Sequence, residues 1–153
     1  MKNEYLRLIL LIERLHRRFL DVIKTELEHL GLEDINNIQT LILYNIGETH
    51  LTIGELTNKG YYLGSNVSYN VKKLVEMGYL EQERSEHDKR SVKVKVSEKG
   101  LSLCEKIDQL YQRNIEELGG MGFGEEETTG IIKNLKKLED FWSKCVGPSE
   151  EFM

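Results

Sequence analysis

The side chains best suited to specific chemistry lie between residues 65 and 76, on one face of a predicted helix. Apolar residues recur there at helical spacing, at Val67, Val71, Leu74 and Val75. At about 100° per residue, the opposite face carries hydrogen-bonding and cationic side chains: Ser65, Asn66, Tyr69, Lys72 and Lys73. Such a face could hydrogen-bond base edges and hold phosphates in a DNA major groove.

The residues that follow predict a small antiparallel hairpin. Gly78 can adopt the left-handed conformation that ends a helix. Residues 79–84 alternate loosely, and residues 92–96 alternate strictly between Val and Lys, which is the period of a β-strand. The polar segment 85–91 joins them. Because a short helix is also expected at residues 53–59, the pattern is that of a helix-turn-helix with a basic hairpin, which predicts a winged helix.

These motifs resemble the multiple-antibiotic-resistance regulator (MarR) family of bacterial transcription factors. The matching pieces are Ser65-x-Val67-Ser68 at the start of the second helix, Leu74 and Gly78 at its end, and Asp88-Lys89-Arg90-Ser91 on the hairpin. The resemblance covers nearly the whole chain in layout, and its specific motifs are confined to residues 51–100. It implies a mainly α fold with a small β-hairpin wing, a helical dimerisation region, and a homodimer on a pseudo-palindromic operator.

The hairpin motif has a physical logic for DNA contact. An Arg at a hairpin tip can enter the narrow minor groove, where negative potential is concentrated. A neighbouring Asp can hold the guanidinium by a charge-assisted hydrogen bond. By resemblance, Arg90 is the minor-groove residue and Asp88 orients it, and the alternative is an ordinary solvated turn. The expected DNA contacts are therefore Ser65, Asn66, Ser68, Tyr69, Lys72, Lys73, Asp88, Lys89 and Arg90.

The second helix departs from the family pattern at three positions. Tyr69 stands where the family often has Arg, Asn70 where Leu is common, and Lys72 where an acid is common. These departures bear on base preference and not on the groove. The stretch from residue 60 to 70 also resembles a branch of the family associated with cell-envelope and peptidoglycan remodelling genes.

Charge is unevenly distributed along the chain. The 153 residues carry a net charge of −5, which by itself argues against nucleic acid. Between Lys59 and Lys99, however, nine Lys or Arg outnumber six Asp or Glu, a net +3, so the remainder carries −8. Cations thus concentrate where a winged helix would meet phosphates, and this asymmetry would orient the protein on DNA.

The first predicted helix, Asn3 to Leu30, is long and amphipathic. Its apolar residues keep helical spacing throughout, and Gly31 should end it. At about 1.5 Å per residue it would span about 40 Å, more than a small winged-helix core can cover. Part of its apolar face must contact something else, and a second subunit is the simplest partner.

The other elements follow from caps and breaks in the pattern. Asp34 is a plausible N-cap for a helix ending at Ile46, and Thr52 with Glu55 forms a capping box. Ser97 should cap a helix from Glu98 to Leu118. The remaining expected elements are a strand at 49–51, a glycine-rich break at 119–124 and a helix at 125–145.

These elements predict the domain organisation. An N-terminal dimerisation helix and C-terminal dimerisation helices would flank one DNA-binding lobe, with a loose tail at the end. The expected ranges are 1–33 for the first helix, 34–96 for the lobe, 97–147 for the C-terminal helices and 148–153 for the tail.

The resemblance also implies regulation by a small molecule. In this family, small aromatic or phenolic effectors enter a mostly apolar crevice between the dimer helices and the winged-helix lobe. The candidates to line it are Phe19, Thr40, Tyr44, Tyr61, Tyr62 and Leu63. Alternatively, these side chains simply fill the core beneath the lobe.

Other functional classes find little support. Cys104 and Cys145 lie on apolar helical stretches, where a small buried hydrophobe is the usual interpretation, although some members of the resembled family sense oxidants through a cysteine. The four His lack metal-ligand spacing, and we find no nucleophile-elbow, phosphate-loop or zinc-protease motif. We therefore expect neither an enzyme nor a cofactor.

Two further expectations concern location and the rival class. No apolar run approaches the roughly 20 residues of a membrane span, and no signal peptide is evident, so we expect a cytoplasmic protein. The main alternative function is a winged-helix protein–protein interaction module without operator binding. Salt dependence of binding to duplex DNA separates the two, because phosphate contacts release counterions.

Overall fold

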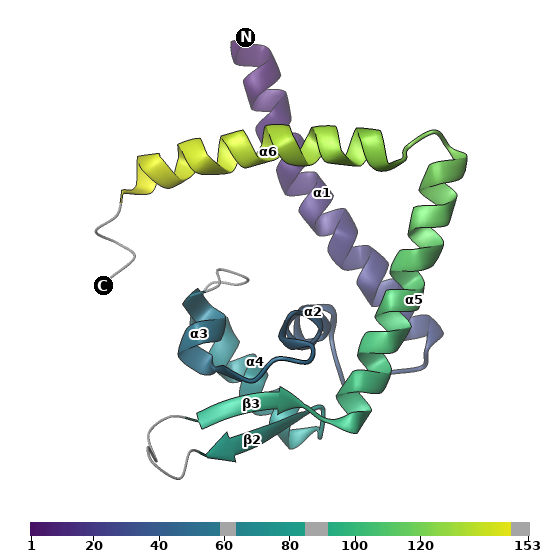
Figure 1. Cartoon of the computed structure of the whole chain (residues 1–153), viewed down its shortest axis with the longest axis vertical. Coiled ribbons are helices and arrows are strands. Elements are labelled where there is room, and N and C mark those ends of the chain that lie inside the picture. The colour runs from purple at the N-terminus through teal and green to yellow at the C-terminus, as the bar shows by residue number, and fades with distance from the viewer. Residues whose placement is uncertain (59–63, 85–91, 148–153) are drawn as a thin grey trace. The chain divides into compact units, whose positions relative to one another are not determined.

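The computed structural model describes residues 1–58, 64–84 and 92–147 and is mainly helical with one small sheet (Figure 1). The chain divides into two compact units, residues 1–109 and 110–153, which are described separately. The elements in chain order are α1 (Lys2–His29), α2 (Asn37–Ile46), β1 (Leu51–Thr52), α3 (Ile53–Asn58), α4 (Gly64–Glu76), β2 (Leu80–Arg84), β3 (Val92–Val96), α5 (Glu98–Gly120) and α6 (Glu125–Val146).

The sheet has the expected hairpin and a third, very short strand. β2 and β3 pair antiparallel, with Leu80 opposite Val96, and β1 pairs with the other edge of β3. The strict alternation of β3 places Val94 and Val96 in the core, while Lys93 is exposed. The predicted winged helix-turn-helix fold is confirmed, and β1 lies at 51–52 instead of 49–51.

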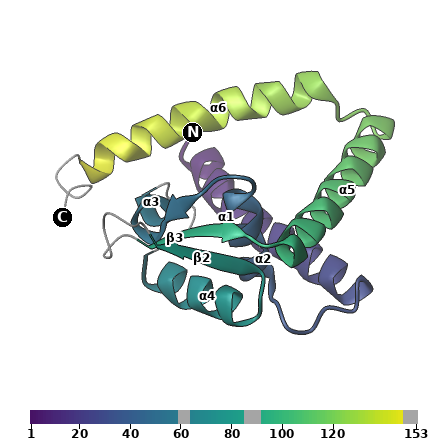
Figure 2. The ribbon, with the colours of Figure 1, turned by 60° about the horizontal axis from the view of Figure 1, so that its bottom comes forward.

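Helix α4 is anchored between α2, α3 and the hairpin (Figure 2). Its Val67, Val71 and Leu74 are each at most 1% exposed, as the apolar periodicity predicts. Gly78, with φ of +83°, ends the helix and turns the chain into β2. The buried face of α4 therefore fixes which residues point outwards.

The start of α2 differs from the prediction. Asn36, not Asp34, is the N-cap: its side chain accepts a hydrogen bond from the backbone of Gln39, and the side chain of Gln39 accepts one from the backbone of Asn36. This capping box satisfies two helix-end donors at once. The Asp34 carboxylate is engaged elsewhere, by Tyr79 and Lys99. At α5, the backbone of Gly100 donates to Ser97 Oγ as the cap prediction requires.

Helices α1 and α6 leave large apolar side chains uncovered. In α1 only Ile23, Glu26 and Leu27 are buried, and no residue of α6 is buried. The exposed apolar residues of α1 and α6 are Leu6, Leu8, Leu10, Leu11, Leu15, Phe19, Val22, Ile131, Ile132, Leu135, Phe141 and Val146. Within residues 1–58, 64–84 and 92–147, no helix combines the length and apolar character needed to cross a membrane.

Candidate nucleic-acid interface

The outer face of α4 presents the residues that the sequence singled out. Asn66, Ser68, Tyr69 and Lys72 are exposed, Tyr69 to 60%, although it is a large aromatic residue. An exposed tyrosine beside amide, hydroxyl and ammonium groups offers donors, acceptors and apolar contact on one surface. We call this surface, Asn66, Ser68, Tyr69, Lys72 and Lys73, the α4 face. The side chain of Ser65 lies outside the described residues.

The two lysines of the α4 face differ in their surroundings. Lys73 Nζ lies 3.6 Å from a Glu76 carboxylate oxygen and 5.7 Å from the centre of the Tyr69 ring. Exposed ion pairs of this kind contribute at most about 1 kcal/mol, so a phosphate can compete for the ammonium group. Lys72 makes no ion pair with another described residue.

Lys95 on the hairpin is paired with acidic residues of the sheet. Lys95 Nζ lies 3.6 Å from Glu81 and 3.4 Å from Glu83 across the β2–β3 pair, and these carboxylates raise the pKa of Lys95. His50 Nδ1 lies 2.8 Å from Glu83, and this contact, with Lys95, lowers the pKa of Glu83. Part of the positive charge is thus balanced within the sheet. Asp88, Lys89 and Arg90 lie outside the described residues.

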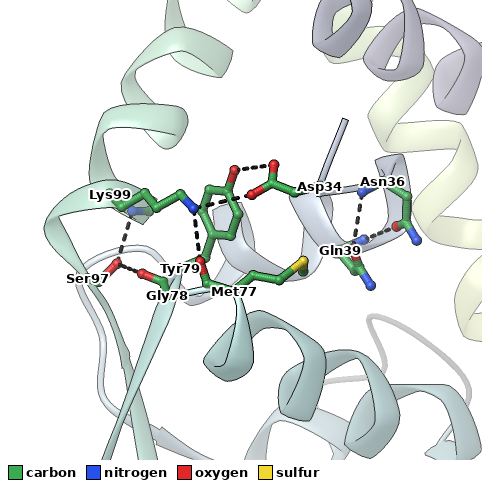
Figure 3. A network of polar contacts seen from close by, with 9 residues as sticks. Asp34, Asn36, Gln39, Met77, Gly78, Tyr79, Ser97 and Lys99 are labelled. Carbon is green, nitrogen blue, oxygen red and sulfur yellow. Dashed lines mark hydrogen bonds and ion pairs between the residues drawn. The ribbon is translucent and has the colours of Figure 1, made fainter. Parts of the chain in front are cut away.

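A polar cluster holds the C-terminal end of α4 in place (Figure 3). Tyr79 OH donates to one Asp34 oxygen at 2.9 Å, and Lys99 Nζ lies 3.2 Å from the other. Lys99 also donates to the Met77 carbonyl at 2.9 Å and sits 4.3 Å from the centre of the Tyr79 ring. This cluster of Asp34, Met77, Tyr79 and Lys99 joins the α1–α2 junction, the end of α4 and the start of α5.

The cluster shifts the ionisation of its members. Partial burial raises the pKa of Asp34, but the Tyr79 hydroxyl and the Lys99 ammonium outweigh it, and the pKa lies below its ordinary value. Burial and the neighbouring Asp34 carboxylate raise the pKa of Tyr79 to about 12. The Tyr79 hydroxyl therefore stays protonated throughout the ordinary pH range and remains the hydrogen-bond donor to Asp34.

Replacing Tyr79 by Phe should destabilise the lobe by about 1–2 kcal/mol, because a partly buried hydrogen bond to a carboxylate is lost. The effect should depend on pH. Since the folded pKa of Tyr79 is raised above its ordinary 10, the stabilisation is present below pH 10 and lost as pH rises through about 12. Urea unfolding across that range should show parent and Tyr79→Phe converging. Parallel curves would contradict this assignment.

Sequence reasoning missed the buried amide pair between α2 and α4. Asn70 is only 8% exposed and Gln39 6%, and Gln39 Nε2 donates to Asn70 Oδ1 at 3.2 Å. Position 70 is three or four residues from Val67 and Leu74 and so belongs to the apolar face. That spacing could have identified Asn70 as a buried amide in need of a partner.

The residues expected to line an effector crevice lie in different environments. Phe19 is 40% exposed on α1, and Thr40 is buried with its hydroxyl donating to the Asn36 carbonyl at 2.8 Å. The Tyr44 hydroxyl donates to Asp108 on α5. Tyr61, Tyr62 and Leu63 lie outside the described residues. A cavity of about 270 Å³ lies elsewhere, against Tyr79, Lys99 and Leu103.

The two cysteines also differ. Cys104 is half-buried, and burial followed by the nearby Asp108 carboxylate raises its pKa to about 11, which disfavours the reactive thiolate. Cys145 is exposed, contrary to the expectation of a buried small hydrophobe. In the described part of the chain, no group of three His, Cys, Asp or Glu is placed to hold a metal ion.

Comparison with known proteins agrees with this geometry. Residues 35–100 match a family model described as a winged helix DNA-binding domain. The chain is 36% identical over 147 residues to the exopolysaccharide II synthesis transcriptional activator ExpG of Rhizobium meliloti (strain 1021), and the match covers 92% of this chain and 73% of that protein.

Two solved structures with DNA share the fold. Streptococcus pneumoniae FabT in complex with DNA matches with a TM-score of 0.75 and 22% identity, covering 92% of this chain and 99% of that one. A mutant MarR from Escherichia coli complexed with operator DNA matches with a TM-score of 0.71 and 24% identity, covering 89% and 96%.

Proposed function

Because the chain belongs to the MarR family of winged-helix DNA-binding transcriptional regulators, we propose that it binds a specific operator as a homodimer. In this proposal, α4 of each protomer enters the major groove. One observation carries it: the three valine and leucine anchors of α4 are buried, while the α4 face is exposed with Tyr69 at its centre. The Tyr69 ring, with its hydroxyl and the neighbouring amide, hydroxyl and ammonium groups, gives this exposed surface both apolar and hydrogen-bonding contacts for base edges and phosphates.

The proposal gives the residues distinct roles. Ser65, Asn66, Ser68 and Tyr69 read base edges, and Lys72 and Lys73 hold phosphates. On the wing, Arg90 enters the minor groove, with Asp88 and Lys89 beside it, as in the resembled family. Contacts to bases set the preferred sequence, whereas contacts to phosphates set affinity for any duplex.

The dimer would be built from the elements that a single chain leaves uncovered. The exposed apolar residues of α1 and α6 exceed the scattered apolar side chains normal on a monomer surface. We propose that residues 1–33 and 97–147 form the dimerisation region and residues 34–96 the DNA-binding lobe. A two-fold dimer would read a two-fold site with half-sites about one helical turn apart.

Substitutions on α4 and the wing should separate these roles. The probe is a duplex that the parent protein selects from a random pool, here called the selected duplex. Lys72→Ala should weaken binding to all sequences and reduce the salt slope by about 1, as expected for one phosphate contact. Arg90→Ala should strongly weaken binding to the selected duplex while leaving the helical circular dichroism unchanged. Fluorescence anisotropy over a salt series measures the affinity and the salt slope of each variant.

The control is Lys106→Ala, which removes an exposed lysine from α5 and should leave affinity and salt slope as in the parent. Parent binding that does not change with salt would contradict the proposal and would favour a protein–protein interaction module. Parent-like binding by Arg90→Ala would contradict the wing assignment alone.

The target genes are proposed to concern the cell envelope. Two observations support this: the resemblance of residues 60–70 to the envelope-associated branch, and the 36% identity to an activator of exopolysaccharide II synthesis. Genome-wide mapping of the DNA bound in the cell tests the idea. Bound sites that lie away from envelope and polysaccharide genes would contradict it.

We also propose that a small aromatic ligand modulates DNA binding. The candidate residues are Phe19, Thr40, Tyr44, Tyr61, Tyr62 and Leu63. The hydrogen bond from Tyr44 to Asp108 links α2 to α5, so a ligand that displaced it could alter the spacing of the two α4 helices. Phenolic compounds titrated against the protein–DNA complex should release DNA from the parent and not from a Tyr44→Phe variant with normal DNA affinity. If the compounds release DNA equally from the parent and from Tyr44→Phe, Tyr44 is not part of the ligand site.

A further inference from the structure

A chain of four polar groups runs from the N-terminus of α2 into the middle of α4. The backbone of Asn36 donates to Gln39 Oε1 at 3.1 Å, and Gln39 Nε2 donates to Asn70 Oδ1 at 3.2 Å. Asn70 Nδ2 then donates to the backbone carbonyl of Asn66 at 2.8 Å. The chain therefore ends on the backbone of a residue whose side chain belongs to the α4 face.

The burial of this chain makes its geometry demanding. Gln39 and Asn70 are 6% and 8% exposed, and no buried side-chain nitrogen or oxygen in the described residues lacks a hydrogen-bond partner. A buried amide that loses its partner bears the full desolvation cost. Sliding or rotating α4 on α2 would break the Gln39–Asn70 bond, which is directional, whereas the apolar contacts of Val67, Val71 and Leu74 set no fixed angle between donor and acceptor.

We propose that Asn70, through Gln39, is a positioning residue for sequence recognition: the pair fixes the rotation and register of α4 and thereby the bases that Asn66 and Tyr69 meet. The inference rests on the proposed function, in which the α4 face reads bases. An apolar residue at position 70 would also be buried against α2, but the register of α4 on α2 would then depend on packing alone. Specificity, more than affinity for DNA in general, is the property that the pair controls.

The test uses near-isosteric apolar replacements, Asn70→Leu and Gln39→Met, and the double variant. Binding to the selected duplex and to a random duplex is measured by fluorescence anisotropy at several salt concentrations. For each single variant, the ratio of the two affinities should fall about tenfold, the size of one good base contact. Random-duplex affinity and the salt slope should stay within about twofold of the parent, because the phosphate contacts remain. The fall in the double variant should be smaller than the product of the two single falls, because the two substitutions share the loss of the Gln39–Asn70 bond.

Ile107→Val is the control for a simple loss of stability. Ile107 is fully buried on α5, and removing one methylene should lower the melting temperature without changing the affinity ratio. Thermal unfolding of every variant identifies any that fail to fold. Such a variant is replaced by the more conservative Asn70→Gln, which keeps an amide. Asn70→Gln should retain part of the discrimination between the two duplexes.

The outcomes are separable. If the parent discriminates and the variants keep its affinity ratio, the positioning inference is wrong. If affinity for both duplexes falls together, Asn70 is merely structural and the inference is again wrong. If the parent itself binds both duplexes equally, the proposed function fails, and the positioning role fails with it.

Discussion

Replacing Ile132 by Glu is expected to convert the protein from a dimer to a monomer and to lower its affinity for the selected duplex by about 100-fold or more. Ile132 is 61% exposed on α6 in the single chain, so a carboxylate there costs the protomer itself little. In the proposed dimer interface, the same carboxylate would be buried without a partner. In the dimer, once one α4 helix has bound its half-site, the second binds at high effective concentration. A monomer lacks this second helix and therefore binds more weakly.

Lys133→Gln is the matched control, because it makes α6 more negative by the same single charge at an exposed position on the face opposite Ile131, Leu135 and Leu138. It should leave mass and affinity unchanged. Light scattering at micromolar concentration reports the mass, and fluorescence anisotropy reports the affinity. An Ile132→Glu protein that remains dimeric and binds the selected duplex like the parent would contradict the assignment of α6 to the interface.

Replacing Gly100 by Ala at the start of α5 is expected to destabilise the protein by about 3 kcal/mol. An added Cβ would lie 2.4 Å from the Tyr79 carbonyl oxygen and 2.5 Å from Val96 Cγ1, closer than real Cβ atoms come. The Tyr79 backbone cannot move away easily, because its carbonyl accepts a hydrogen bond from the backbone of Ser97. The start of α5 would have to shift off the end of α4.

Gly119→Ala provides the comparison, since an added Cβ there meets nothing within 4 Å. In a helix, Ala is favoured over Gly by up to about 1 kcal/mol, so this variant should be as stable as the parent or slightly more stable. Urea midpoints measured at one fixed protein concentration give both values. A Gly100→Ala midpoint equal to the parent's would show that α5 does not approach Tyr79 as described.

Local patterns in the sequence were enough to predict most elements. The Val and Leu spacing of α4, the Val–Lys alternation of β3, and the positive-φ glycines after α1, α2 and α4 each depend on neighbours within one or two helical turns. Helices α1, α5 and α6 accordingly end within about two residues of their predicted limits. A periodic pattern specifies which face is buried, and for α4 that was sufficient to predict the α4 face.

The start of α2 was misplaced because two polar residues competed for the same role. Asp34 has the chemistry of an N-cap, but Tyr79 and Lys99, which lie 45 and 65 residues away in the sequence, engage its carboxylate. Asn36, with Gln39 three positions later, fits the capping-box spacing and is the N-cap of α2. Periodicity carries no information about partners so far apart.

The same limit applies to the buried and charged residues around the site. Asn70 differs from the apolar residue common at its position, yet only the fold reveals Gln39, 31 residues earlier, as its partner. The net charge of residues 59–99 includes Lys95, Glu81 and Glu83, but it does not show that they pair across the strands. A charge count along the chain gives the total and not which cations are left for a phosphate.

Hydroxyl-radical footprinting of the selected duplex tests most directly the claim that this chain reads DNA as a two-fold dimer through α4. We expect two blocks of protection related by a two-fold axis, with centres about one helical turn apart, and loss of both blocks with Ile132→Glu. A single block without a symmetry mate, or uniform protection along the duplex, would contradict the account.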